Sequence, residues 1–264
     1  MHYFSAYNTD IGIRRKTNQD SLVIRHASTD KGETIMAVVC DGMGGLAEGE
    51  LASKEMALRF ASWFSDVLPD YIYSELNMEL LKKDWGRIII DQDDIMSIYA
   101  EKKGYILGTT VTALLLFDDH YYIVHVGDTR CYQFFEDSVK QITEDDSLVE
   151  SELRRGMITP EEAETDPRRN ILTNCVGGER GVIPGFYDGV IGASIGFLLC
   201  TDGFWHRNSP EKLNEISASL LAGDAENLQR TLAERTEYVK KNKEKDNITA
   251  VAVGIKGNKI CSGM

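Results

Sequence analysis

The sequence predicts an α+β fold in which helices lie outside antiparallel β-sheets. Segments with strand character follow one another in groups, and segments with helical character lie between the groups rather than after each strand. Two strand-like segments, 109–117 and 120–126, are separated only by Asp118 and Asp119, as in an antiparallel hairpin. No repeat, low-complexity tract or linker divides the 264 residues, so we expect a single domain over 1–264.

Strands are expected where short apolar segments are rich in Val, Ile, Leu, Thr and aromatic residues. The short connection of Gly127 and Asp128 predicts a second hairpin, between 120–126 and 130–135. The full set of expected strands is 3–7, 21–26, 34–40, 109–117, 120–126, 130–135, 139–142, 195–201 and 248–255.

Helices are expected where apolar residues recur at helical spacing or where a helix start signal occurs. Apolar spacing predicts a helix from residue 51 onwards, with one face on the core. Ile95, Ile98 and Tyr99 indicate a second amphipathic helix within 69–107. Start signals follow later in the chain: a capping box with proline at Thr159, a Ser-Pro start at 209–210, and a helix over 225–240.

Composition excludes several classes of protein. The net charge is -13, from 42 acidic and 29 basic residues, which disfavours a nucleic-acid or anionic-membrane surface. Five cysteines without a C-x-x-C pair indicate neither a disulfide framework nor a thiolate zinc site, and Cys40, Cys131 and Cys200 are expected in the core. Without a signal-peptide pattern or an apolar run of membrane-spanning length, we expect a cytoplasmic monomer.

Five aspartates stand beside predicted strands, which points to a metal site. One aspartate at a strand end is a common turn residue. If five converge, however, their like charges cannot all stay ionised without a cation. A ligand set of oxygen atoms alone selects Mg²⁺ or Mn²⁺ rather than Zn²⁺, and two such ions lower the pKa of a water between them and hold a phosphoryl group. The five are Asp20, Asp41, Asp128, Asp202 and Asp246.

The stretch TIMAVVCDGMGGLAE is the centre of this pattern. Its apolar run ends at Asp41, which we expect at the rim of a sheet, on backbone that a ligand can approach. A rival interpretation is a dinucleotide-binding fingerprint formed by Gly42, Gly44 and Ala47. Asp41 would then stand unfavourably beside the pyrophosphate, and no second parallel strand with an acidic end follows. A nucleotide-dependent oxidoreductase is therefore the weakest alternative.

Arg15 precedes Asp20 in the polar connection DIGIRRKTNQD. A guanidinium group suits bidentate binding of phosphate oxygens. The alternative is that Arg15 belongs to a solvated basic cluster, and only the other signs of phosphate chemistry favour the first interpretation.

Six short motifs follow one another through nearly the whole chain. They are Gly12-x-x-Arg15-x-x-Asn18-Gln19-Asp20, Asp41-Gly42-Met43-Gly44-Gly45, Gly108-Thr109-Thr110, Val126-Gly127-Asp128-Thr129-Arg130, Thr201-Asp202-Gly203 and Asp246-Asn247-Ile248-Thr249. In this order and spacing the chain resembles the protein phosphatase 2C family, the metal-dependent protein Ser/Thr phosphatases, in its compact bacterial form.

The resemblance implies a four-layer α-β-β-α sandwich with a central antiparallel β-sandwich and metal ions at one end. It implies that 1–264 form a single phosphatase domain with a flap subdomain at about 146–178, beside the site, which affects the choice of substrate.

The resemblance also implies roles for individual residues. Asp41 would bridge two ions and the Gly42 carbonyl would bind the second. Asp202 and Asp246 would hold the first ion, and Asp20 would act through water.

For the remaining site residues, the resemblance implies that Asp128 and Asp202 bind the third metal of bacterial members. Arg15 would hold the substrate phosphate, so that Arg15 and Asp41 are the residues expected to be catalytic.

Three residues depart from the family pattern. Met43 stands where many eukaryotic members have the histidine proposed as general acid, which leaves protonation of the leaving group to water. His206 follows the Asp-Gly pair where bacterial relatives often carry Asp or Asn, and we expect an exposed loop histidine. Asp146 stands where histidine is common at the entrance to the flap, so contacts there are expected to differ.

The sequence therefore predicts a Mn²⁺- or Mg²⁺-dependent hydrolase that acts on phosphoserine and phosphothreonine in proteins, through direct attack by a metal-activated water. Expected partners are phosphorylated proteins in signal transduction, including a Ser/Thr kinase, with no nucleic acid and no membrane. The alternative is a catalytically inactive adaptor that binds phosphoproteins or a kinase. Five retained aspartates argue against it, because without metal they repel phosphate.

Overall fold

Alternation along one strand sets the layers of the fold. In β3 (Gly32–Gly44), successive side chains point to opposite faces of the sheet. One set packs against helices and the other against a second sheet, so the strand is buried on both faces. The helix-facing residues are Met36, Val38 and Cys40, and the sheet-facing residues are Ile35, Ala37 and Val39.

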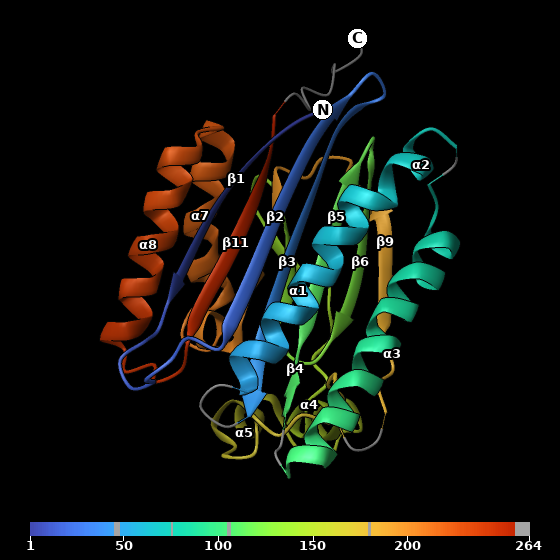
Figure 1. Cartoon of the computed structure of the whole chain (residues 1–264). Coiled ribbons are helices and arrows are strands. Elements are labelled where there is room, and N and C mark those ends of the chain that lie inside the picture. The colour runs from blue at the N-terminus through green and yellow to red at the C-terminus, as the bar shows by residue number, and fades with distance from the viewer. Residues whose placement is uncertain (45–47, 75, 105–106, 179–180, 257–264) are drawn as a thin grey trace.

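The computed structural model describes residues 1–44, 48–74, 76–104, 107–178 and 181–256, in which two antiparallel sheets lie face to face (Figure 1). One sheet has the strand order β1-β11-β10-β7-β8 and the other has β2-β3-β5-β6-β9, with β4 paired to β3. The further strands are β1 (His2–Asp10), β2 (Asp20–Thr29), β4 (Leu107–Thr109), β5 (Val111–Phe117), β6 (His120–Val126), β7 (Arg130–Phe134), β8 (Val139–Gln141), β9 (Gly185–Val190), β10 (Gly196–Cys200) and β11 (Ile248–Lys256).

Helices cover both outer faces of the sandwich. α1 (Glu48–Asp66) and α3 (Met78–Lys103) lie on the sheet that contains β3, and α7 (Pro210–Ala222) and α8 (Ala225–Lys241) lie on the other, as Figure 1 shows. The predicted four-layer α-β-β-α sandwich is confirmed. The short helices are α2 (Leu68–Ile72), α4 (Leu148–Arg154), α5 (Pro160–Thr165) and α6 (Asp202–Trp205).

The sequence placed most elements correctly, including the capping box at Thr159. The predicted strand 34–40 continues to Gly44 because its last residues pair with β4. β9 was not predicted, because GFYDGV is a partly exposed edge strand with little apolar character. Gly45, Ala47 and Cys261 lie outside the described residues.

The second predicted hairpin was wrong. β5 and β6 pair as expected, but β6 and β7 belong to different sheets. Gly127 adopts a φ of 103°, which favours glycine, and the chain turns there from one sheet to the other. This corner leaves Asp128 at the same end of the sandwich as Asp41.

The second amphipathic helix was predicted correctly, but not through residues that face the core. Ile95, Ile98 and Tyr99 are 50%, 52% and 38% exposed. α3 is instead buried through Leu81, Trp85, Ile89 and Met96, which are spaced by one or two helical turns along its other face. None of the helices in the described ranges combines the length and apolar character needed to cross a membrane.

The chain between β8 and β9 crosses the end of the sandwich that carries Asp41. It contains α4 and α5. An isolated bridge between Ser147 and Leu172 joins its two limbs, and a second bridge, between Val176 and Thr109, connects it to β4. This is the segment predicted as the flap.

Trp85 lies in the core between α1, α3 and the sheet that contains β3, and replacing it tests this packing. It is fully buried, and its ring packs edge-on to Trp63 at 5.3 Å. We expect Trp85→Ala to lower the free energy of unfolding by about 3–5 kcal/mol. Trp85→Phe is expected to cost less, since the indole N–H has no hydrogen-bond partner among the described residues. Urea unfolding measures both, with the half-exposed Ile98→Ala as a control near about 0.5 kcal/mol. Equal losses for Trp85→Ala and Ile98→Ala would contradict this packing.

Candidate active site

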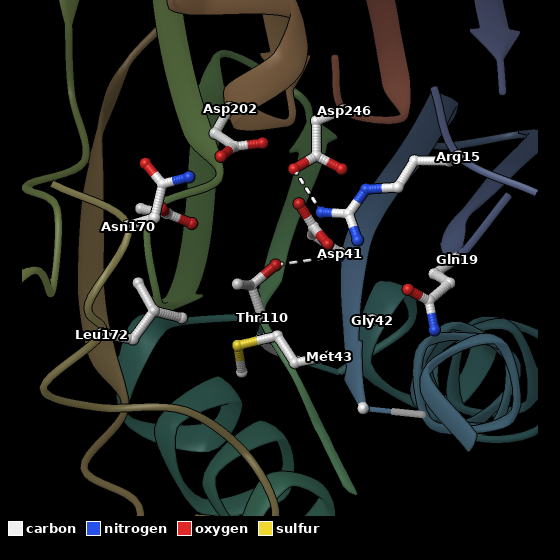
Figure 2. Close-up of a pocket in the computed structure, with 12 residues that line it drawn as sticks. Arg15, Gln19, Asp41, Gly42, Met43, Thr110, Asn170, Leu172, Asp202 and Asp246 are labelled. Carbon is white, nitrogen blue, oxygen red and sulfur yellow. Dashed lines mark hydrogen bonds and ion pairs between the residues drawn. The ribbon is translucent and has the colours of Figure 1, made fainter. Parts of the chain in front are cut away.

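Four of the five predicted aspartates line one cavity of about 210 Å³ at the end of the sandwich (Figure 2). Asp41, Asp128, Asp202 and Asp246 come from four different parts of the chain, and Arg15 joins them from the β1–β2 connection. Asp20 lies buried behind them and is not part of the wall. The full lining is Arg15, Gln19, Asp41, Gly42, Met43, Gly44, Thr110, Asp128, Asn170, Leu172, Asp202 and Asp246.

Strand pairing fixes Asp41 and Asp20 relative to each other. The two residues are directly opposite in the register of β2 and β3, so their side chains are close neighbours. The Asp41 N–H donates to Thr110 Oγ1 at 2.9 Å, and its carbonyl accepts from the Thr110 N–H at 2.9 Å. Both the N–H and the carbonyl of Asp41 are therefore bound to Thr110, which fixes the backbone there.

Gly42 lies where the backbone must come close to neighbouring segments. Its N–H donates to the Gln19 carbonyl at 3.0 Å. A Cβ atom at this position would collide with the Gly49 carbonyl oxygen. Only glycine fits here, which lets β3 pass close to Gly49 and keeps its backbone near the cavity.

Asp128 is held at the corner where the chain changes sheets. Its carbonyl accepts a hydrogen bond from Trp205 Nε1 at 3.0 Å. The guanidinium of Arg130 lies 3.3 Å from the centre of the Trp205 ring and forms a bidentate pair with Asp145. Contacts from α6, β7 and the segment after β8 thus fix the corner.

Asp202 begins α6, directly after β10. Its neighbour Thr201 donates from Oγ1 to Asp20 Oδ2 at 3.0 Å, so this hydrogen bond connects Asp20 to the end of β10. Gly203 packs so closely on the Asn247 carbonyl that a side chain would collide with it. The Asp202 and Asp246 loops are consequently held against each other.

Asn247 shapes the loop that carries Arg15. Its buried side chain donates to the carbonyls of Ile11 at 2.9 Å and Thr17 at 3.0 Å, and it accepts from the Gln19 N–H at 2.9 Å. Arg15 Nη2 then donates to Asp246 Oδ2 at 2.6 Å, as Figure 2 shows. Asn247 and Asp246 together hold the guanidinium beside the cavity.

Burial makes the ionised aspartates costly. Burial raises the pKa of Asp20 to about 7, with the Asp246 charge adding to the effect. Burial, and then the charge of Asp145, raise the pKa of Asp128 to about 7. The pKa values of Asp41 and Asp202 also lie well above the usual range, through burial and then through neighbouring aspartates.

Two carboxylate oxygens show what the site lacks. Asp20 Oδ1 and Asp202 Oδ1 are buried and have no hydrogen-bond partner among the described residues. Unpaired buried carboxylate oxygens are unfavourable unless a cation or donor approaches them. The all-oxygen donor set therefore fits a hard divalent cation such as Mg²⁺ or Mn²⁺.

The carboxylates surround the cavity rather than closing on one point. As the side chains stand, no group of three or more His, Cys, Asp or Glu within the described ranges forms a ready cation cage. An ion here would take some ligands from backbone oxygen and water, as Mg²⁺ commonly does.

His206 was expected to be exposed, and this was wrong. Its side chain is only 5% exposed, with its ring edge-on to Trp205 at 4.2 Å. The reason is that α6 continues through the Asp-Gly pair and turns His206 inward, toward Asp202 at 3.8 Å. Burial lowers the pKa of His206 to about 3, so the imidazole is neutral at physiological pH.

Asn170 and Leu172 line the cavity, and neither residue was predicted individually, although the flap was expected beside the site. They lie in the polar segment after α5, where neither periodicity nor an apolar strand marks a site. Met43 faces the same cavity, as Figure 2 shows. Gln19, Thr110 and Asn247 were within predicted motifs, but their contacts were not predictable from spacing.

The raised pKa of Asp20 makes stability of the chelator-treated protein depend on pH. The pKa of Asp20 is about 7 in the folded protein, above the ordinary 3.8. The free energy of unfolding is therefore highest below pH 3.8 and falls as the pH rises towards 7, because the unfolded chain releases this proton first. In a thermal melt at about pH 8, Asp20→Asn is expected to melt above the wild type, and at about pH 4 the difference should vanish. A mutant that melts lower at both pH values would contradict the charge penalty.

Comparisons with known proteins identify the family of the chain. The profile of the family described as "Protein phosphatase 2C" matches residues 13–250. Serine/threonine phosphatase stp of Listeria innocua is 31% identical over 259 residues, which cover 96% of this chain and 95% of the relative. Among solved structures, serine/threonine phosphatase Stp1 from Staphylococcus aureus has a TM-score of 0.81 at 29% identity, covering 97% and 96% of the two chains. The catalytic domain of PstP in complex with 2 manganese ions has a TM-score of 0.75 at 27% identity, covering 96% and 97%. The chain belongs to the protein phosphatase 2C family.

Proposed function

We infer that the chain is a metal-dependent phosphoprotein phosphatase that hydrolyses phosphoserine and phosphothreonine. The observation that carries this is the meeting of Asp41, Asp128, Asp202 and Asp246 with Arg15 around one cavity. Carboxylates alone repel a phosphate monoester, and an arginine alone binds it without cleaving it. Together with divalent cations they form a site for attack on phosphorus.

The proposed metal ligands follow the placement of the donors. Asp41 lines the cavity together with the other carboxylates, and we propose it as the ligand that two ions would share, with the Gly42 carbonyl beside it. Asp202 and Asp246 would hold the first ion. Asp20 lies behind the wall, which supports its action through water rather than by direct contact.

Divalent ions bound there supply a water of lowered pKa and shield the charge of the phosphoryl oxygens. Two ions are proposed, Mn²⁺ or Mg²⁺, and Asp128 and Asp202 would hold a third. The PstP structure with 2 manganese ions supports the first two.

Arg15 is proposed to bind the substrate phosphate. Its guanidinium is about half exposed, and one nitrogen is paired with Asp246. The remaining N–H groups have no hydrogen-bond partner within the described part of the chain. They are available to donate to phosphate oxygens and to stabilise the charge that develops during attack. Met43 has a thioether and no proton to give, so we propose that the leaving hydroxyl takes its proton from water.

The flap is proposed to contact the protein substrate. Asn170 and Leu172 form the wall of the cavity opposite Asp41 in Figure 2. The segment of about 146–178 would thus form a subdomain of the single domain and affect substrate choice. A Ser/Thr kinase is proposed among the substrates, for a cytoplasmic, monomeric enzyme.

An inactive adaptor is the remaining alternative, and no observation favours it. Titration calorimetry with Mn²⁺ separates the two, because an adaptor has no need of the ion.

Replacing Asp41 or Asp202 by asparagine tests the metal site. We expect Mn²⁺-dependent hydrolysis of an aryl phosphate to fall by more than about 100-fold, because each mutation removes a charged ligand. The thermal melt in chelator should remain cooperative. Full activity in either mutant, or activity of the wild type in excess chelator, would disprove the proposed function.

Replacing Arg15 by alanine tests the phosphate contact. We expect KM for an aryl phosphate to rise by roughly 10- to 100-fold, because hydrogen bonds to a charged group are lost. Inhibition by inorganic phosphate should weaken in parallel. Arg14→Ala is the matched control, because Arg14 is the exposed neighbour outside the cavity wall. Equal effects of the two mutations would indicate a general charge effect instead.

A further inference from the structure

The flap segment leaves the sandwich and returns to it beside the corner that carries Asp128. Its outgoing limb starts at Asp146, next to the Ser147–Leu172 bridge. Its returning limb ends with the bridge of Val176 to Thr109, in the strand next to Asp41. The position of the flap therefore depends on a few contacts at this base.

Asp146 makes contacts to three segments at once. Its carboxylate oxygen Oδ2 accepts from the Gly127 N–H at 3.0 Å and from Asn174 Nδ2 at 2.8 Å. Its own N–H donates to the Gly127 carbonyl at 2.7 Å, and its carbonyl accepts from the Thr173 N–H at 2.7 Å. One residue thus joins the sheet corner, the outgoing limb and the returning limb.

The two partners of the carboxylate lie next to the site. Gly127 directly precedes Asp128 in the chain. Asn174 is two residues beyond Leu172, which lines the cavity, and its own amide also binds the backbone of Ile183 at 2.8 and 3.1 Å. A displacement of the returning limb would therefore move the cavity wall.

The chemical type of residue 146 matters for this contact. A carboxylate oxygen accepts two hydrogen bonds, as Oδ2 does here. A neutral imidazole offers one acceptor nitrogen, so a histidine at this position could not accept both hydrogen bonds.

The outer part of the flap is held together separately. Arg168 pairs with Glu152 and with Asp166, each at 2.7 Å, and these contacts bind the flap to itself rather than to the sandwich. Loss of the contact at the base would then displace the flap without dispersing it.

We propose that Asp146 is a positioning residue that fixes both limbs of the flap to the Gly127–Asp128 corner and so sets the cavity wall at Asn170 and Leu172. The proposal rests on the proposed function in one respect, namely that this wall meets a phosphoprotein. Asp146 itself does not line the cavity.

Limited proteolysis of the full chain tests the anchoring without any need for activity. Trypsin cleaves after arginine, and Arg154, Arg155 and Arg168 are exposed in the flap. In Asp146→Ala, cleavage in the flap is expected to become about tenfold faster, because both hydrogen bonds to the carboxylate are lost. Asp146→Asn keeps an acceptor oxygen and should stay close to the wild type.

Controls separate anchoring from general destabilisation. Glu161→Ala lies on the exposed side of α5 and should cleave at the wild-type rate. If Asp146→Ala does not fold, Asn174→Ala removes the returning-limb contact to the Asp146 carboxylate, together with the two contacts to Ile183, and should cleave faster than the wild type. Flap cleavage at the wild-type rate in every folded variant would overturn the proposal.

Steady-state kinetics then tests the link to substrate. In Asp146→Ala, KM for a phosphothreonine peptide should rise about three- to tenfold, and Asp146→Asn should restore it. Unchanged KM with faster proteolysis would reduce Asp146 to an anchor without effect on substrate and overturn that part of the proposal. Faster proteolysis in a protein with no phosphatase activity would leave the anchor intact and reject the proposed function instead.

Discussion

The crowding of buried carboxylates at one end of the sandwich is the constraint on which the rest of this structure depends. Asp20, Asp41, Asp128 and Asp202 all have raised pKa values, because burial and mutual repulsion disfavour their charged forms. Keeping these carboxylates together lowers the free energy of unfolding of the metal-free protein, so a function is needed to explain their arrangement. A divalent cation reverses the balance, since it neutralises the charges and gives partners to the orphaned oxygens.

The two sheets meet this constraint by contributing strand ends to a common rim. The register of β2 and β3 places Asp20 opposite Asp41, and the corner at Gly127 brings Asp128 from one sheet towards the other. Backbone hydrogen bonds then hold each aspartate in position, as do the two between Asp41 and Thr110. A cavity built on strand ends can hold charged groups at fixed separations, which suits stabilisation of a developing phosphoryl charge.

Polar contacts, rather than strand pairing and apolar packing, position the flap. Its polar helices bury few apolar residues, so hydrogen bonds and ion pairs determine where it lies. The hydrogen bonds of Asp146 hold the base of the flap on the sandwich, and the ion pairs of Arg168 hold its outer part together. A surface of this kind can vary between relatives while the carboxylate site stays the same.

The sequence by itself determined the layers and the donor set. The continuous apolar run 35–40 indicates a strand buried on both faces, and aspartates at strand ends indicated the carboxylates that line the cavity. Only the tertiary structure decided which neighbours each segment has. It turned the Gly127 connection into a change of sheet, buried His206, exposed Ile95, and brought Asn170 and Leu172 to the cavity. The physical reason is that periodicity and turn chemistry are local, whereas these outcomes depend on contacts between residues far apart in the chain.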